Sequence, residues 1–194
     1  MRYVWTDAGD DPDLAVGDRH GINGYFMPIF DSVTTVPLLY HIKSKGHAVG
    51  LYVGHGWLSS LTPKAAAAKA SSEYKRLSVP GLRFQWNLEE HDPTRIIEIL
   101  REWRRLHPQV GTSWTLESMQ GGWMDPLFVA EIIQLKVRVV PQCFQGNMTT
   151  VAQDIVLRNL MRRGFPEALV TCMYDAANLP AEWDGYTFRM GRLP

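Results

Sequence analysis

The sequence repeats one unit, in which a short run of β-branched and aromatic residues is followed by a polar loop and a helix. Three of the helices begin at a Thr-Pro or Asp-Pro pair, at Thr62-Pro63, Asp92-Pro93 and Asp125-Pro126, about 30 residues apart. The first residue of such a pair caps the helix through its side-chain oxygen, and proline is favoured at the first helical position. Strands that alternate with helices at this spacing predict βα units and a parallel sheet.

The chain of 194 residues contains eight runs that predict strands. Eight units favour closure into a single (β/α)8, or TIM, barrel domain over residues 1–194. The chain is short for this fold, with little room for a helix between Asp10 and Ile22 and none after the eighth run. We therefore expect a compact α/β TIM-like barrel that lacks one or two outer helices. The predicted strands are Arg2–Ala8, Gly24–Asp31, His47–Trp57, Leu82–Glu89, Val110–Glu117, Val137–Phe144, Glu167–Asp175 and Gly185–Gly191.

An open, doubly wound sheet is the alternative architecture. Nucleotide-binding members of that class carry GxGxxG after the first strand or the phosphate loop GxxxxGK[ST], and the sequence contains neither pattern there. We therefore favour the barrel.

Composition excludes several classes of function. Lys plus Arg and Asp plus Glu both number 20, so the formal charge is zero and a nucleic-acid partner is not expected. No apolar run is long enough to span a membrane and no export signal is apparent, so we expect a soluble protein made in the cytoplasm. Cys143 and Cys172 have no CxxC or histidine partner, so neither a metal nor another cofactor is expected. Both cysteines have outward parity and predict small buried side chains.

Polar side chains share one face of the two central predicted strands. In Phe84–Glu89 the apolar residues alternate with Gln85, Asn87 and Glu89, and in the next strand with Ser113, Thr115 and Glu117. Alternate residues of a strand point to opposite faces, so one set faces the helices and the polar set faces the barrel interior. The pattern predicts a polar pocket that opens at the carboxyl ends of the strands, where barrel enzymes hold their active sites.

Carboxylates and aromatic rings gather at these strand ends. We predict catalytic roles for Glu89, Glu117, Asp7 and Asp175, with Glu89 as the general acid. Paired carboxylates cleave glycosidic bonds, and aromatic rings stack on the apolar faces of sugars. The candidate substrate-binding residues are Asn87, Gln142, Trp57, Trp123, Tyr52, Tyr174 and His55.

Each candidate also has a structural interpretation. Glu89 could be held by backbone amides at the approach to a helix, and Asp7 and Asp175 could cap loops. His55 could be a surface-loop residue, and the tryptophans could belong to the core. Asp92 and Asp125 are interpreted as helix caps, and Glu90 has outward parity.

Four short motifs carry a resemblance to a known family. The order "WTD", "GLYVG", "WNLE" and "MYD" resembles the glycoside hydrolase family 25 muramidases and the related barrels of actinobacterial and phage proteins. By that resemblance, Glu89 matches the acid that cleaves peptidoglycan, Asp7 matches the aspartate of the first strand, and Asp175 matches a late aspartate. Asn87 departs from the family, which has an aspartate there, and the opening "TDAGDD" lacks the family's Asp-x-Ser.

Two functions from different classes follow. One is a glycoside hydrolase that acts on a polysaccharide such as peptidoglycan. The other is a non-catalytic structural or glycan-binding subunit of a larger assembly, such as a minor tail protein of a phage. Asn87 cannot carry charge, and an incomplete helix layer would leave apolar wall for a partner, unless loop residues such as Leu14–Val16 or the terminal RLP cover it. The expected ligand is a carbohydrate. The second function also predicts that the chain assembles into a homo-oligomer or a virion.

Overall fold

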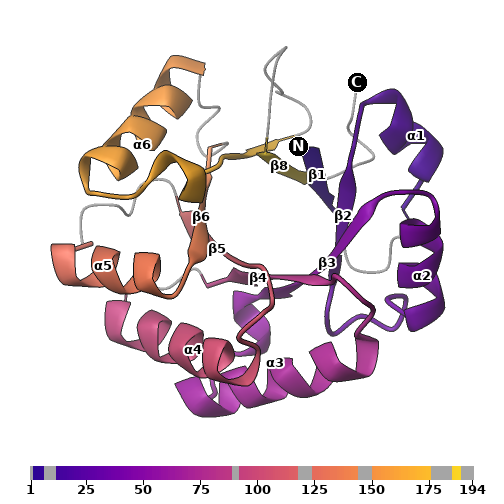
Figure 1. Cartoon of the computed structure of the whole chain (residues 1–194), viewed down its shortest axis with the longest axis horizontal. Coiled ribbons are helices and arrows are strands. Elements are labelled where there is room, and N and C mark those ends of the chain that lie inside the picture. The colour runs from indigo at the N-terminus through magenta and orange to yellow at the C-terminus, as the bar shows by residue number, and fades with distance from the viewer. Residues whose placement is uncertain are drawn as a thin grey trace.

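The computed structural model describes residues 2–6, 12–88, 92–117, 124–143, 150–175 and 185–188. Its strands form a closed parallel barrel in chain order, and β1 pairs with β8 to close it (Figure 1). The (β/α)8 prediction is therefore confirmed. The strands are β1 (Arg2–Trp5), β2 (Gly24–Pro28), β3 (Ala48–Gly54), β4 (Arg83–Asn87), β5 (Thr112–Glu117), β6 (Val137–Gln142), β7 (Met173–Asp175) and β8 (Gly185–Phe188).

Six α-helices of the described residues surround the barrel (Figure 1). No described helix follows β7 or β8, which confirms a barrel that lacks outer helices. A short helix does form in the narrow space after β1, where Asp13 caps it by accepting from the amide of Val16. The helices are α1 (Leu14–Arg19), α2 (Val36–Ser44), α3 (Pro63–Leu77), α4 (Pro93–Leu106), α5 (Pro126–Gln134) and α6 (Thr150–Arg162), with 3₁₀ turns η1 (His55–Trp57) and η3 (Glu167–Leu169).

The three predicted Pro-led helix starts are confirmed. Thr62, Asp92 and Asp125 are the N-caps of α3, α4 and α5, and each accepts backbone N–H bonds from the first turn. These caps fix where each chain segment leaves the carboxyl end of a strand and turns back along the outside of the barrel.

The outer core lies between the strands and the helices. Phe84 and Trp86 point outward from β4, as their parity predicts, and pack against Trp103 of α4 at ring-centre distances of 4.0 and 5.4 Å. Trp103 is fully buried, and its indole N–H donates to Thr112 Oγ1 at 3.0 Å. This aromatic cluster joins β4, β5 and α4, so it holds in place the two strands that carry the polar interior face.

The barrel wall between α6 and α1 is covered at two outward-facing residues of β1 and β8. Val4 of β1 and Thr187 of β8 face outward there, and both are fully buried. Of the two alternatives for this wall, coverage by other parts of the chain therefore holds at these residues. Separately, no helix in the described part of the chain has the length and apolarity needed to cross a bilayer.

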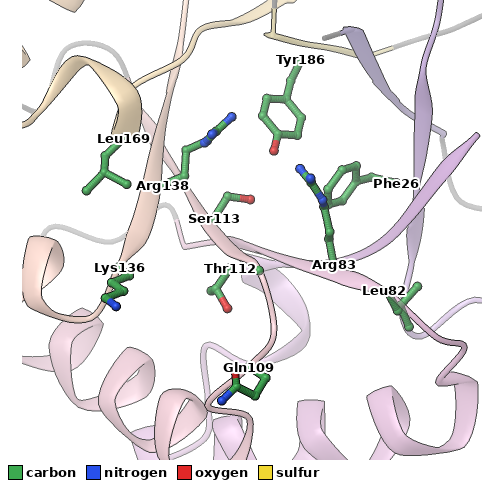
Figure 2. A pocket seen from close by; sticks show the side chains of 12 residues that line it. Phe26, Leu82, Arg83, Gln109, Thr112, Ser113, Lys136, Arg138, Leu169 and Tyr186 are labelled. Atoms are coloured by element: carbon green, nitrogen blue, oxygen red, sulfur yellow. The ribbon is translucent and has the colours of Figure 1, made fainter.

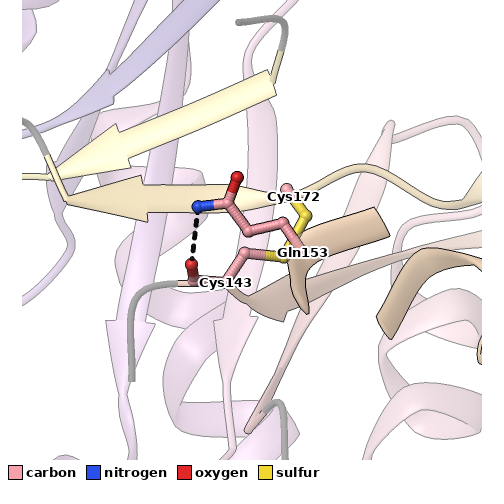
Figure 3. Close-up of a disulfide and its surroundings, with 3 residues drawn as sticks. All are labelled: Cys143, Gln153 and Cys172. Carbon is pink, nitrogen blue, oxygen red and sulfur yellow. Dashed lines mark hydrogen bonds between the residues drawn. A yellow bond between two sulfur atoms is a disulfide. The ribbon is translucent and has the colours of Figure 1, made fainter. Parts of the chain in front are cut away.

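Cys143 and Cys172 form a disulfide (Figure 3). Both are buried, as their outward parity predicts, and the bond between them was not predicted from the sequence. Cys143 follows β6 and Cys172 precedes β7, with their Cα atoms 5.7 Å apart, which is within the range of a disulfide. Gln153 of α6 donates to the carbonyl of Cys143 at 3.1 Å. The bond therefore ties β6 to β7 beneath α6.

Replacing both cysteines by serine should lower the free energy of unfolding by about 2–4 kcal/mol, because the bond closes a loop with a sequence separation of 29 residues. Urea unfolding of the wild type with and without reductant measures this loss. The double variant is the control and should not respond to reductant. Uptake of two alkyl groups by the unreduced, denatured wild type would contradict the pairing.

His107, at the end of α4, is a buried histidine that should make stability depend on pH. Its Nε2 lies 2.8 Å from Ser71 Oγ, and its ring packs on Trp103 and Tyr74. Burial lowers the pKa of His107 below its ordinary value of 6.5, and the charge of Lys75 acts in the same direction. As the pH falls, His107 is therefore protonated at a higher pH in the unfolded chain than in the folded protein.

We expect the stabilisation by neutral His107 to be present above about pH 6.5 and to be lost as the pH falls from there toward the lowered pKa. Urea midpoints at about pH 7.5 and pH 5.5 measure the loss. His107→Gln should be less stable at the higher pH and should show a smaller difference between the two conditions. An unchanged pH dependence in the variant would contradict the assignment.

Candidate functional site

Aromatic rings pack against one another inside the barrel, toward its amino end. Tyr3 stacks on Tyr186 at a ring-centre distance of 5.2 Å, and Phe26 meets both rings edge-on. Glycines on the neighbouring strands make room for them, because a Cβ at Gly24 would lie 2.8 Å from the Tyr3 ring and one at Gly50 2.4 Å from the Phe26 ring. The period-two spacing of Tyr3 and Trp5 was the available sequence signal for this packing.

A buried chain of hydrogen bonds crosses the interior above these rings. Gln85 accepts from the indole N–H of Trp5 at 3.0 Å and donates to Thr115 Oγ1 at 2.8 Å. Gln85, Ser113 and Thr115 are all buried, which confirms the predicted polar parity of β4 and β5. Because both ends of the Gln85 amide are bonded, its orientation is fixed, and it forms a rigid polar floor beneath the mouth of the barrel.

Two amide side chains lie at the carboxyl end above this floor. Gln142 of β6 approaches Asn87 of β4, with Nε2 3.5 Å from Oδ1. Asn87 is partly exposed and Gln142 is buried. The backbone register pairs Asn87 with Thr115 and Glu117 with Gln142, so the ends of β4, β5 and β6 meet here. Both amides can donate and accept hydrogen bonds, but neither carries charge.

Aromatic side chains border the same mouth on the side of β3. Tyr52 stacks flat on Trp5 at 4.4 Å and donates to the carbonyl of Thr6 at 2.9 Å. Further out, Trp57 stacks on Phe30 at 5.0 Å, and Trp57 is 48% exposed. The indole of Trp57 lies against the end of β3, because a Cβ at Gly54 would lie 3.4 Å from Trp57 Cδ1. Gly54 pairs with Asn87, so Trp57 lies on the side of the mouth where β3 and β4 end.

Lys69 of α3 adds one charge to this edge, because its ammonium lies 5.1 Å from the centre of the Phe30 ring. The cation contacts the aromatic ring, an attraction that holds Phe30 in place beneath Trp57. Within the described part of the chain, no group of three or more His, Cys, Asp or Glu side chains could hold a metal ion.

The remaining predicted residues are not brought together by the described structure. Asp7, Glu89 and Trp123 lie outside the described residues. Only the backbone is described for Glu117 and Asp175, at the ends of β5 and β7, and for His55 in η1. Tyr174 faces the opposite way from Met173 on β7 and packs in the outer core rather than at the mouth. The described candidates that do lie together are Asn87, Gln142, Tyr52 and Trp57.

Comparison with known proteins identifies the fold and assigns no function. No protein-family model and no curated protein matches the chain. Among solved structures, D-psicose 3-epimerase with D-tagatose from Clostridium cellulolyticum H10 is similar with a TM-score of 0.60 and 13% identity, covering 97% of this chain and 84% of the other. Tryptophan synthase subunit alpha from Legionella pneumophila str. Paris is similar with a TM-score of 0.53 and 12% identity, covering 97% and 79%. At these identities the similarity shows a TIM-barrel fold alone.

Proposed function

We propose that the protein binds a carbohydrate at the carboxyl-end mouth of its barrel. The observation that carries the proposal is the half-exposed Trp57, which stacks on Phe30 and lies beside Gly54 at the end of β3, the strand that neighbours β4 and its Asn87. An indole face offers the flat apolar surface on which a pyranose ring stacks. Asn87 and Gln142 supply neutral donors and acceptors, which suit sugar hydroxyls.

The rigid floor supports the same function. Gln85 is held from both sides by Trp5 and Thr115, so polar atoms beneath the mouth keep fixed positions without a ligand. A site whose groups are already ordered loses less conformational entropy when it binds. This matters for sugars, whose hydroxyls must replace water at each contact.

Hydrolysis is the further step of this proposal, with Glu89 as general acid. Glu89 follows the inward-facing Asn87 by two residues, so an extended chain would carry it toward the same mouth. Glu117, Asp7 and Asp175 are the proposed nucleophile, base or electrostatic partners. The substrate class proposed from the resemblance to family 25 muramidases is bacterial cell-wall peptidoglycan.

Binding without hydrolysis is the second candidate, and the contact between Asn87 and Gln142 favours it. The muramidase-like pattern has an aspartate at the position of Asn87, whose charge would support an oxocarbenium-like transition state. Here a neutral amide approaches another neutral amide at 3.5 Å. In this candidate the barrel is a glycan-binding or structural subunit, of which a phage tail component is one form.

Replacing Trp57 by alanine should weaken carbohydrate binding about tenfold, because truncating an aromatic anchor costs more than about 1 kcal/mol. Calorimetric titration with soluble peptidoglycan fragments, and with other oligosaccharides in parallel, measures the change. Tyr40→Ala on α2 is the matched control, since Tyr40 is 50% exposed and lies outside the mouth. Equal weakening by both variants, or no binding of any glycan by the wild type, would overturn the proposal.

A further inference from the structure

A cavity of about 410 Å³ opens at the amino end of the barrel, opposite the proposed carbohydrate site (Figure 2). Arg83, the first residue of β4, and Arg138, the second residue of β6, line it. Ser113 of β5 lies between them, since β5 separates β4 from β6 and Ser113 pairs directly with Arg138. Lys136 adds a third basic residue to the lining.

The two guanidinium groups both extend toward Tyr186, and both of their charges act on its hydroxyl. Figure 2 shows Arg83 and Arg138 reaching into the cavity from either side, toward the hydroxyl of Tyr186. Arg83 lies 5.3 Å from the centre of the Tyr3 ring, and Arg138 makes one long contact, at 3.5 Å, with the carbonyl of Ala168. No acidic side chain is among the described residues that line the cavity. Two like charges are thus held near each other without a described carboxylate between them, an arrangement that a bound anion would stabilise.

Buried hydroxyl groups complete the donor set. Tyr186 and Ser113 are 2% and 4% exposed. The pKa of Tyr186 is raised, chiefly by burial, while its bond with Ser113 and the charges of Arg138 and Arg83 act in the opposite direction. The phenol therefore stays protonated near neutral pH and can donate a hydrogen bond. Phe26 and Leu82 give the cavity an apolar wall beside these donors.

We propose that this amino-end cavity binds a small molecule that carries a phosphate group. A tetrahedral phosphate presents oxygens in several directions, which suits guanidinium groups that approach from two strands and hydroxyls that come from a third side. A carboxylate has two oxygens in one plane and would engage fewer of these donors. The volume leaves room for more than the phosphate alone.

The structural alternative is that the arginines only cover the end of the barrel. Residues at the amino face of a TIM barrel usually serve stability. On that interpretation the protein would show no saturable anion binding. Replacement of either arginine would then change the free energy of unfolding and nothing else.

The test is calorimetric titration of the full chain with inorganic phosphate and pyrophosphate at constant ionic strength. We expect saturable binding that Arg83→Met and Arg138→Met each weaken about tenfold or more, as expected for the loss of a charge-assisted hydrogen bond. Arg158→Met is the matched control, because Arg158 lies on the exposed surface of α6 and pairs with Asp154, and it should leave the affinity unchanged. Ser113→Ala removes one donor without a change in charge and should weaken binding a few-fold, which keeps the test valid if an arginine variant does not fold.

Three results would overturn the proposal. The first is the absence of saturable binding to either phosphate probe, and the second is equal weakening by Arg158→Met. The third is acetate or citrate binding as tightly as pyrophosphate, which would assign the cavity to carboxylates. None of these outcomes depends on whether the opposite mouth binds a carbohydrate, so the two proposals can fail separately.

Discussion

Trp103→Ala is expected to lower the free energy of unfolding by about 3–5 kcal/mol, a large part of the total stability of an ordinary domain. Trp103 is fully buried and contacts Phe84, Trp86, Tyr74 and His107. Its removal leaves a cavity between α4 and the strands and takes a donor away from Thr112. Urea unfolding monitored by circular dichroism measures the loss.

Trp103→Phe is the control for this prediction, since it keeps a ring against Phe84 and loses the hydrogen bond to Thr112. We expect it to cost less than half as much as the alanine variant. If Trp103→Ala unfolds within about 1 kcal/mol of the wild type, the cluster does not hold β4 and β5 against α4. The polar face of β4 and β5 would then be positioned by other contacts than those of Trp103.

Glu89→Gln should reduce glycan hydrolysis at least about a hundredfold while glycan affinity changes little. Glutamine keeps the shape and the hydrogen-bonding capacity of glutamate but cannot deliver a proton to the leaving oxygen, and general acid catalysis contributes about 10²–10⁴-fold. Release of reducing ends from purified peptidoglycan measures the rate, and calorimetric titration measures the affinity.

Glu90→Gln is the matched control, because Glu90 neighbours Glu89 in sequence and has the opposite parity in an extended strand. It should retain the rate of the wild type. Full activity of Glu89→Gln would remove Glu89 from the role of acid. A wild type that binds a glycan and never cleaves it would favour the non-hydrolytic candidate.

The barrel could be predicted from the sequence because its signals are local. A Thr-Pro or Asp-Pro pair sets the start of a helix within four residues, as at Thr62, Asp92 and Asp125. Alternation within one strand decides which face Gln85 and Trp86 take. Each of these preferences acts within a single unit, and the closed sheet is what eight such units form.

Contacts between residues that meet only when the barrel closes could not be predicted from these local signals. The disulfide joins Cys143 and Cys172 across β6 and β7, and their shared outward parity indicated burial but not the pairing. Tyr3 stacks on Tyr186, and Arg83 and Arg138 line one cavity. Both arrangements depend on how far strands that are distant in sequence are shifted along the barrel relative to each other. Tyr174 was expected at the mouth because it precedes a strand-end aspartate, but it lies two residues after the outward-facing Cys172 and shares its face of the short β7.

The most direct test of the central claim is nuclear magnetic resonance of the tryptophan indole N–H groups during titration with a soluble peptidoglycan fragment. Each signal can be assigned with single Trp→Phe variants. We predict that the signals of Trp57 and Trp5, at the mouth and on its floor, shift in a saturable manner while those of Trp86, Trp103 and Trp114 in the outer core stay in place. Saturable shifts confined to the outer-core tryptophans, or no shift with any glycan tested, would contradict a carbohydrate site at the carboxyl end of the barrel.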